Sequence, residues 1–136
     1  MGAKIKRTET RTIEITGVRQ FLKGVEATSI PDRLEAATAL ILSIMTGGKI
    51  VVKNAVPELL KKFTNALYDI GVEISFKKNI GKITKIKKPL KPKNITTGAH
   101  PGFMTDWQPI ITLLLASMSK GESIIHERIF ETRWRY

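Results

Sequence analysis

The chain has 136 residues, a hydrophobic fraction of 42% and a formal net charge of +11, a balance typical of one globular domain. No apolar run approaches the ~20 residues of a membrane-spanning helix, and the polar, basic N-terminus lacks the apolar segment of a signal peptide. The absence of cysteine excludes disulfides and thiolate chemistry, and the two histidines show no metal-binding spacing, so we expect a cytoplasmic protein without a membrane partner or a metal.

Apolar patterning predicts the elements of the first two-thirds of the chain. Residues 1–12 are predicted to form a basic tail. Asp32 can cap a helix whose apolar residues recur at helical spacing until a glycine pair beginning at Gly47 ends it. Pro57 starts a second helix, which Gly71 stops. Strands are expected at residues 12–18, 24–30, 49–54, 72–76 and 82–86.

The last third of the chain is predicted to hold a short strand, a turn, a buried helix and a final strand. The short strand is expected at 95–97, Pro101 and Gly102 form the turn, and the apolar run from Ile110 to Met118 predicts the helix. Alternation over 122–130 predicts the final strand. The order β-β-α-β-α-β-β and then β-α-β indicates repeated α/β units. We assign 13–136 to a single partial domain, with a first repeat at about 13–88 and an incomplete second repeat at about 93–136.

Asp106 has two interpretations that the residue spacing leaves open. With Asp106 as the N-cap, Pro109 falls in the first helical turn, where it has no hydrogen bond to lose. Spacing alone favours a capping residue and nothing more, because aspartate is strongly preferred at that position. The functional interpretation is a carboxylate that a helix end holds at a cleft, ready to accept a substrate proton.

Eight lysines lie between Lys77 and Lys93, and no acidic residue separates them. One interpretation is a surface that binds phosphates or nucleic acid. The other, which we favour, is a solvated hairpin whose lysines protect the edge of a sheet. The run lacks the interleaved aromatic residues of a stacking platform and is poor in arginine, so we expect no sequence-specific nucleic-acid partner.

Three motifs carry a resemblance to a known family. The first is Ile-Pro-Asp-Arg-Leu-Glu-Ala at 30–36, followed by Thr-Gly-Gly at 46–48. The second is His-Pro-Gly-Phe-Met-Thr-Asp-Trp-Gln at 100–108, and the third is Glu-Arg-Ile-Phe-Glu-Thr-Arg at 127–133. In order and spacing they resemble the UDP-N-acetylglucosamine 1-carboxyvinyltransferases, which are enolpyruvyl transferases. The resemblance covers nearly the whole chain but only about the middle third of a full-length enzyme, which suggests a fragment.

The resemblance implies a fold and a reaction. The fold is an inside-out α/β (α+β) barrel built from β-α-β-α-β-β repeats, here incomplete, with the active site between two domains. The reaction transfers the enolpyruvyl group of phosphoenolpyruvate to the 3′-hydroxyl of UDP-N-acetylglucosamine, the first committed step of peptidoglycan synthesis, and needs no cofactor. Cell-wall biogenesis, cell shape, the cell cycle and cell division would depend on it.

The resemblance also implies roles for residues of this chain. Asp106 is similar to the carboxylate that contacts the sugar and serves as general base. Ile129 is similar to a residue whose backbone touches the nucleotide sugar, and Thr105 and Phe130 would flank that pocket. Near the interdomain cleft we expect Asp32, Arg33, Glu35 and Arg133.

The sequence departs from the family pattern at several positions. The family usually has proline at Met104, asparagine at Thr132, glutamate at Thr16 and a different motif end from Trp134 onward. The family's mobile loop with its reactive cysteine or aspartate is absent from this sequence, as are the residues that bind phosphoenolpyruvate. We therefore expect the chain alone to be inactive, and to use phosphoenolpyruvate only together with a missing domain.

Two other functions stay open from the sequence. One is a shikimate-pathway enolpyruvyl transferase relative, although its expected motifs are missing. The other is a noncatalytic module that binds nucleic acid or phosphate on a related repeat scaffold. Self-association through the exposed cleft face or a sheet edge is a further expectation.

Overall fold

The computed structural model describes residues 2–133. Their contacts divide the chain into two compact units, which meet between Ile30 and Pro31. We expected the folded domain to begin at residue 13, but the contacts assign residues 13–30 to the N-terminal unit. The repeat boundaries within the larger unit stay predictions. No helix within residues 2–133 is both long and apolar enough to cross a membrane.

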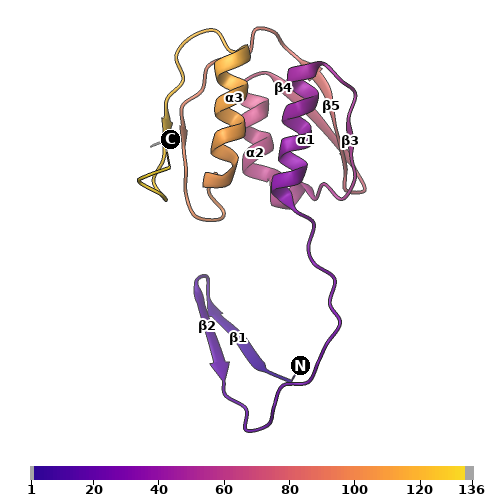
Figure 1. Ribbon diagram of the computed structural model, residues 1–136, viewed down its shortest axis with the longest axis vertical. Coiled ribbons are helices and arrows are strands. Elements are labelled where there is room, and N and C mark those ends of the chain that lie inside the picture. Colours follow the sequence, from indigo (N-terminus) through magenta and orange to yellow (C-terminus); the bar gives the residue numbers. More distant parts are fainter. Residues whose placement is uncertain (1, 134–136) are drawn as a thin grey trace. The chain divides into compact units, whose positions relative to one another are not determined.

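The N-terminal unit is a two-stranded hairpin followed by an extended segment (Figure 1). β1 (Lys4–Glu9) and β2 (Thr12–Thr16) pair antiparallel, with a register shift between Arg7 and Glu9. The predicted basic tail over 1–12 is therefore wrong. Charged residues flank the single isoleucine of β1, Ile5, and the backbone of this strand pairs with β2 while all of its residues are exposed. The strand expected at 24–30 is also wrong, since those residues pair with no described strand.

The larger unit contains three α-helices, one 3-10 helix and five strands within residues 31–133. The elements are α1 (Arg33–Thr46), β3 (Val51–Val52), α2 (Pro57–Asp69), β4 (Val72–Lys77), β5 (Ile80–Ile86), β6 (Ile95–Thr96), η1 (Thr105–Trp107), α3 (Gln108–Met118) and β7 (Ile125–His126). β4 and β5 form the predicted hairpin, and strand order β3-β5-β4 gives a small antiparallel sheet, while β6 and β7 form a separate parallel pair.

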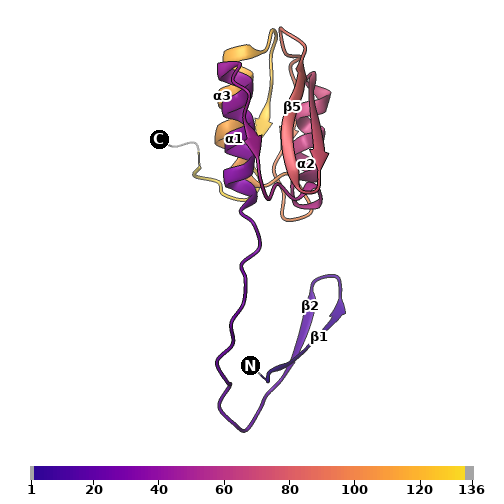
Figure 2. The ribbon, with the colours of Figure 1, turned by 90° about the vertical axis from the view of Figure 1, so that its right-hand side faces the viewer.

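The three helices run side by side with the antiparallel sheet packed against them. Figures 1 and 2 show α1 and α3 together in one layer, with α2 and the sheet behind them. Helix α1 contacts α2, α3 and β5, and α2 contacts β4. The helices and the antiparallel sheet share one hydrophobic core, and β6 and β7 lie beyond α3 in Figure 1.

Both predicted helix boundaries of α1 follow from local chemistry. The Asp32 side chain accepts a hydrogen bond of 2.6 Å from the amide of Leu34, so Asp32 is the N-cap, as predicted. Gly47 ends the helix in the left-handed region at φ 70°, where a residue with a Cβ would be strained. α2 begins at Pro57, whose missing N–H costs nothing in the first turn.

An aromatic cluster at the N-terminal end of α3 fixes the start of that helix. Trp107 is 2% exposed and packs against Phe63 of α2 and Phe103, with ring centroids 5.3 Å and 5.5 Å away. Aromatic pairs at such separations add to the apolar area that they bury. Trp107 ends η1, and within this turn Thr105 is buried with Trp107 while Asp106 between them is exposed.

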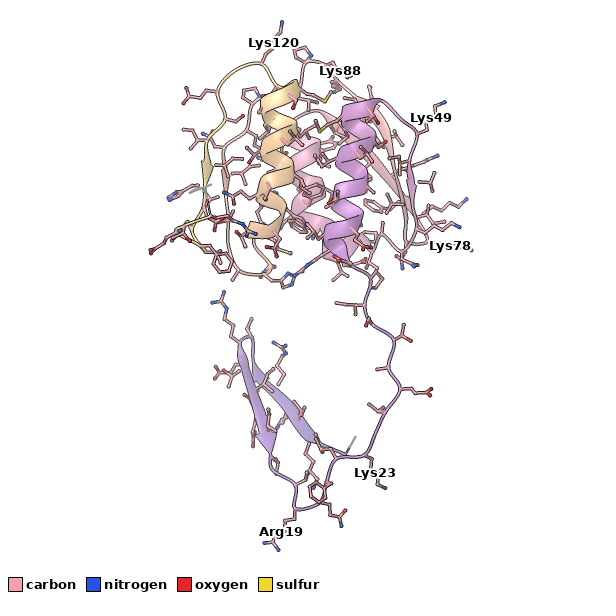
Figure 3. The ribbon with its side chains drawn as sticks, in the orientation of Figure 1. Arg19, Lys23, Lys49, Lys78, Lys88 and Lys120 are labelled. Carbon is pink, nitrogen blue, oxygen red and sulfur yellow. The ribbon has the colours of Figure 1, made fainter. Side chains whose placement is uncertain are left out.

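The lysine-rich segment forms the predicted hairpin, with a tighter turn than expected. Lys78 and Asn79 both have positive φ, which gives a two-residue turn between β4 and β5. Lys85 lies 3.8 Å from Glu73, and Lys93 lies 2.8 Å from Asp69. In Figure 3, Lys49, Lys88 and Lys120 lie toward the end of the unit where α1 and α3 terminate, while Lys78 lies elsewhere at the hairpin turn. These lysines fit a solvated face better than one groove for a strand of nucleic acid.

Candidate functional site

Asp106 lies in the 3-10 turn η1 and not at the N-cap of α3. The N-cap of α3 is Trp107, which makes no side-chain capping bond, and Pro109 falls in the first turn as predicted. The capping interpretation of Asp106 is therefore wrong. A single 3-10 turn precedes the α-helix and moves the helix start by one residue, so the Asp106 carboxylate is available for another partner.

That partner is Arg133. Its Nη2 donates to Oδ1 of Asp106 at 3.0 Å, and its Nη1 donates to the hydroxyl of Thr105. The same guanidinium carbon lies 5.6 Å from the ring centroid of Phe130, a cation–π distance. The Asp106 side chain is 48% exposed, so solvent or a ligand reaches the carboxylate while Arg133 holds one of its oxygens.

Glu127 connects three segments of the chain beneath this pair. Its Oε2 accepts a hydrogen bond of 2.7 Å from the Thr105 hydroxyl, and its Oε1 accepts one of 2.9 Å from the Thr97 hydroxyl. Oε1 also accepts the amides of Ile129 at 2.6 Å and Phe130 at 3.1 Å. We call this set of contacts the Glu127 network.

The Glu127 network sets the charge of that carboxyl group. Burial opposes the ionised form, yet the hydrogen bonds from Thr105, Ile129, Phe130 and Thr97 outweigh it and lower the pKa of Glu127 to about 2. Glu127 is therefore an ionised carboxylate near neutral pH. An ionised carboxylate only accepts hydrogen bonds, so each hydroxyl that faces it must donate.

The parallel pair β6 and β7 positions the network. Ile95 pairs with Ile125 and Thr96 with His126, so the next residues of each strand, Thr97 and Glu127, are neighbours. The predicted strand over 122–130 is wrong beyond β7, because the Glu127 carboxylate takes the amides of Ile129 and Phe130 that a longer ladder would use. The chain turns there and brings Arg133 back to η1.

The structure brings five of the predicted site residues together. Thr105 and Asp106 contact Arg133, and the exposed Ile129 and Phe130 follow Glu127 on the same segment. No hydrogen bond or ion pair described within residues 2–133 joins these five to the residues expected near the cleft at the start of α1, although α1 and η1 are in contact. Those three residues are Asp32, Arg33 and Glu35. Arg33 does reach the central motif, since its Nη1 lies 3.4 Å from Nδ1 of His100.

Comparison with known proteins decides the family. The family model described as EPSP synthase (3-phosphoshikimate 1-carboxyvinyltransferase) matches residues 1–135. The chain belongs to the EPSP synthase family.

Relatives of this EPSP synthase family chain carry the name that the motifs predicted. Over 99% of its own length, the chain is 43% identical to a UDP-N-acetylglucosamine 1-carboxyvinyltransferase of Kosmotoga olearia. Over all of its own length, it is 40% identical to one of Clostridium botulinum. One of Deinococcus radiodurans is 38% identical over 98% of the chain. The chain spans 31%, 32% and 31% of these three relatives, about a third of their length.

A solved structure agrees with the expected fold. The enolpyruvyl transferase NikO from Streptomyces tendae matches 98% of this chain with a TM-score of 0.80 and 25% identity, and the match covers 32% of NikO. The predicted resemblance and the enolpyruvyl transferase fold type are confirmed. The helices and short sheets of residues 2–133 close no barrel, which accords with the expected incomplete barrel.

Two residues of the site in this EPSP synthase family chain were missed from the sequence. In the sequence, Glu127 stands out only as the first residue of the third motif, and Thr97 only as the end of a predicted strand. Within residues 2–133 both side chains meet through a hydrogen bond between residues 30 positions apart. The available signal was weak: a threonine ending one predicted strand and a glutamate on the next, in a β-α-β order that permits parallel pairing.

The described residues of the family member offer no obvious metal site. No group of three or more His, Cys, Asp or Glu residues within 2–133 lies close enough to hold an ion. What the site presents is a guanidinium that contacts both a half-exposed carboxylate and a hydroxyl. Such groups bind and orient a polar ligand and accept a proton from it.

Proposed function

We propose that this chain supplies part of the active site of a UDP-N-acetylglucosamine 1-carboxyvinyltransferase. The reaction transfers the enolpyruvyl group of phosphoenolpyruvate to the 3′-hydroxyl of UDP-N-acetylglucosamine and releases phosphate. It serves peptidoglycan synthesis in the cytoplasm, and through it cell-wall growth, cell shape and cell division. Phosphoenolpyruvate binds only where segments beyond this third of the relatives' length complete the site.

One observation carries the proposal: the Asp106 carboxylate is half exposed and Arg133 holds one of its oxygens. With Oδ1 bound to Arg133, the proposal assigns Oδ2 to accept the proton of an incoming hydroxyl. A carboxylate with a fixed orientation meets the geometric requirement for proton transfer better than one whose side chain rotates freely. The names of the relatives supply the substrate to which this geometry is matched.

The chemical step assigns one role to each side chain. The 3′-hydroxyl oxygen forms a bond to the central carbon of the enolpyruvyl group, and the bond from that carbon to the phosphate oxygen breaks. The hydroxyl proton passes to Asp106 and ends on the released phosphate, which regenerates the carboxylate. Ile129 contacts the sugar nucleotide through its backbone, while Thr105 and Phe130 border the pocket. Asp32, Arg33, Glu35 and Arg133 line the cleft.

Chemical-shift mapping on the 136-residue chain tests the proposal. Titration with UDP-N-acetylglucosamine should shift amides from Thr105 to Asp106 and from Ile129 to Phe130, and Asp106→Ala should weaken binding by about tenfold, the usual value of a lost charge-assisted hydrogen bond. Asp69→Ala, which removes a comparable exposed carboxylate elsewhere, is the matched control. Shifts confined to the lysine-rich hairpin would contradict the proposal.

The same titration separates the two enolpyruvyl acceptors. The family model is described by the shikimate enzyme, whereas the relatives at 38–43% identity are described by the sugar-nucleotide enzyme. Shikimate 3-phosphate should therefore leave the Asp106 region unshifted. If it shifts those amides and UDP-N-acetylglucosamine does not, the shikimate assignment replaces this one.

Self-association belongs to the same proposal. Strand order β3-β5-β4 leaves β3 and β4 at the edges of the sheet, and an open strand edge is a template for pairing. The cleft face is the other candidate contact. Sedimentation at increasing protein concentration measures self-association directly.

A further inference from the structure

We infer that Glu127 is a positioning residue for Asp106, acting through Thr105 and Arg133. The inference rests on the proposed role of Asp106 and adds a residue that no motif match assigned to the site. It concerns which group donates each hydrogen bond along the series Glu127, Thr105, Arg133 and Asp106, where Asp106 receives the substrate proton.

Hydrogen-bond polarity carries the argument. The Thr105 hydroxyl has one proton, and it donates that proton to Oε2 of Glu127 at 2.7 Å. Toward Arg133 the same hydroxyl can then only accept, and Nη1 of Arg133 donates to it. The guanidinium is planar, so fixing Nη1 on Thr105 also fixes the direction of Nη2, which donates to Oδ1 of Asp106.

The negative charge on Glu127 fixes which group donates in its hydrogen bond with Thr105. A carboxylate cannot donate, so the Thr105 proton has a single favourable direction while Glu127 is ionised. The other bonds of the network hold the carboxylate itself in place, since Thr97 and the amides of Ile129 and Phe130 all donate to Oε1. Oε2 is therefore directed at Thr105.

Glu127→Gln reverses the polarity at nearly constant shape. If the glutamine oxygen takes the place of Oε1, its NH₂ group faces Thr105 and donates to the hydroxyl. The Thr105 proton must then turn toward Arg133, where two donors meet and the contact is lost. Thr105→Val removes the hydroxyl that links Glu127 to Arg133, so it interrupts the same series of hydrogen bonds at the next residue.

The first test measures Arg133 on the ligand-free 136-residue chain. Nitrogen-15 spectra of labelled arginine, assigned with Arg133→Lys, report whether rotation of its guanidinium is restricted. We expect restriction in the wild type and in Glu122→Gln, an exposed glutamate five residues earlier that serves as the matched control. In Glu127→Gln and in Thr105→Val, we expect the Arg133 guanidinium to rotate without restriction.

A double-mutant cycle distinguishes positioning from a merely structural role. If Glu127 acts through Thr105, then Glu127→Gln has little further effect on Arg133 once Thr105 is valine. If Glu127 only folds the segment after β7, the substitution has the same effect in both backgrounds, and the inference is overturned. Restricted rotation that survives in Glu127→Gln overturns it as well.

A second measurement covers the case in which Glu127→Gln does not fold. The carboxyl carbon of Glu127 is titrated in the wild type, in Thr105→Ser and in Thr105→Val. We expect a higher midpoint in the valine variant and a restored low midpoint in the serine variant, because only the hydroxyl is at issue. Identical midpoints in all three would overturn the inference.

Binding separates this inference from the proposed function. UDP-N-acetylglucosamine should bind Glu127→Gln about tenfold more weakly than the wild type, with no change for Glu122→Gln. A wild-type chain that fails to bind the sugar nucleotide at millimolar concentration counts against the proposed function. The Arg133 spectra would in that case still decide whether Glu127 positions the Thr105–Arg133–Asp106 chain.

Discussion

Asp106 combines an exposed carboxylate with an ion pair, and these two features separate its effects on stability and on chemistry. Exposed pairs such as Asp106–Arg133 contribute little to folding. Asp106→Asn should therefore change the free energy of unfolding by less than about 1 kcal/mol. Once the chain is completed to the length of its relatives, turnover should fall by a factor on the order of 10²–10⁴, because the proton acceptor is gone.

Thermal melting and phosphate release measure the two effects of Asp106→Asn. The matched control is Asp69→Asn, which breaks the exposed pair with Lys93 and should leave turnover intact. Wild-type turnover in Asp106→Asn would place the general base elsewhere.

Glu127 should make the stability of the chain depend on acidity. Its pKa is lowered from 4.5 to about 2 on folding, so the unfolded chain binds the proton more readily than the folded chain. The stabilisation is fully present above about pH 4.5 and is lost as the pH falls through about 2. Its size is about 1–3 kcal/mol after allowance for the partly exposed side chain.

Denaturant unfolding at about pH 7 and pH 3 measures this dependence. The stability of the wild type should fall more steeply between the two conditions than that of Glu127→Gln, which has no proton to bind there. Glu122→Gln should follow the wild type. Parallel losses in all three proteins would mean that other carboxyl groups set the acid sensitivity.

At the scale of elements, the cap of α1 is the clearest local determinant. The Asp32 carboxylate receives the Leu34 amide, and α1 contacts α2, α3 and the sheet. Asp32→Ala should cost about 1 kcal/mol of stability, whereas Asp32→Asn keeps a capping oxygen and should cost a few tenths at most. Melting temperatures of the two variants test this, and equal losses would contradict the capping role.

Helices were predicted better than strands, and the reason is physical. α1 and α2 carry their boundary signals within the segment, at Asp32, Gly47 and Pro57. Strands depend on a partner elsewhere in the chain, which a sequence pattern does not name. The segment at 24–30 has a strand-like pattern and no described partner. The charged residues of β1 did not suggest a strand, yet β1 pairs with β2.

The start of α3 shows a subtler limit. Pro109 and the polar residues before it predicted the position of the first turn, but not that a 3-10 turn would come first. Burial of Trp107 against Phe63 and Phe103 contributes to that geometry, and it involves a contact with α2 that local spacing does not contain. The Asp106 cap was wrong for that reason.

For the whole molecule, we expect no transferase activity from the 136-residue chain by itself. The relatives named for this reaction are about three times longer, and transition-state contacts for two substrates must converge at one site. Phosphate release that depends on both phosphoenolpyruvate and UDP-N-acetylglucosamine is the measurement. Release above a control with heat-denatured chain would refute the expectation.

The sequence predicted the members of the site better than their connections. Motif resemblance brought Thr105, Asp106 and Arg133 into consideration, and the structure joins them. It did not reveal Glu127 as their common support, because that role exists only when the ends of β6 and β7 and the turn η1 converge. Such a convergence is a property of the fold.

The separation along the chain between the partners of the Glu127 network, and between Asp106 and Arg133, has a kinetic consequence. Thr97 and Glu127 are 30 residues apart, and Asp106 and Arg133 are 27 apart, so each contact closes a long loop. Loop closure of this length costs entropy before any contact is gained, whereas helices form from neighbours. The site should therefore assemble after the helical core, and substitutions at Glu127 should speed unfolding while leaving the folding rate nearly unchanged.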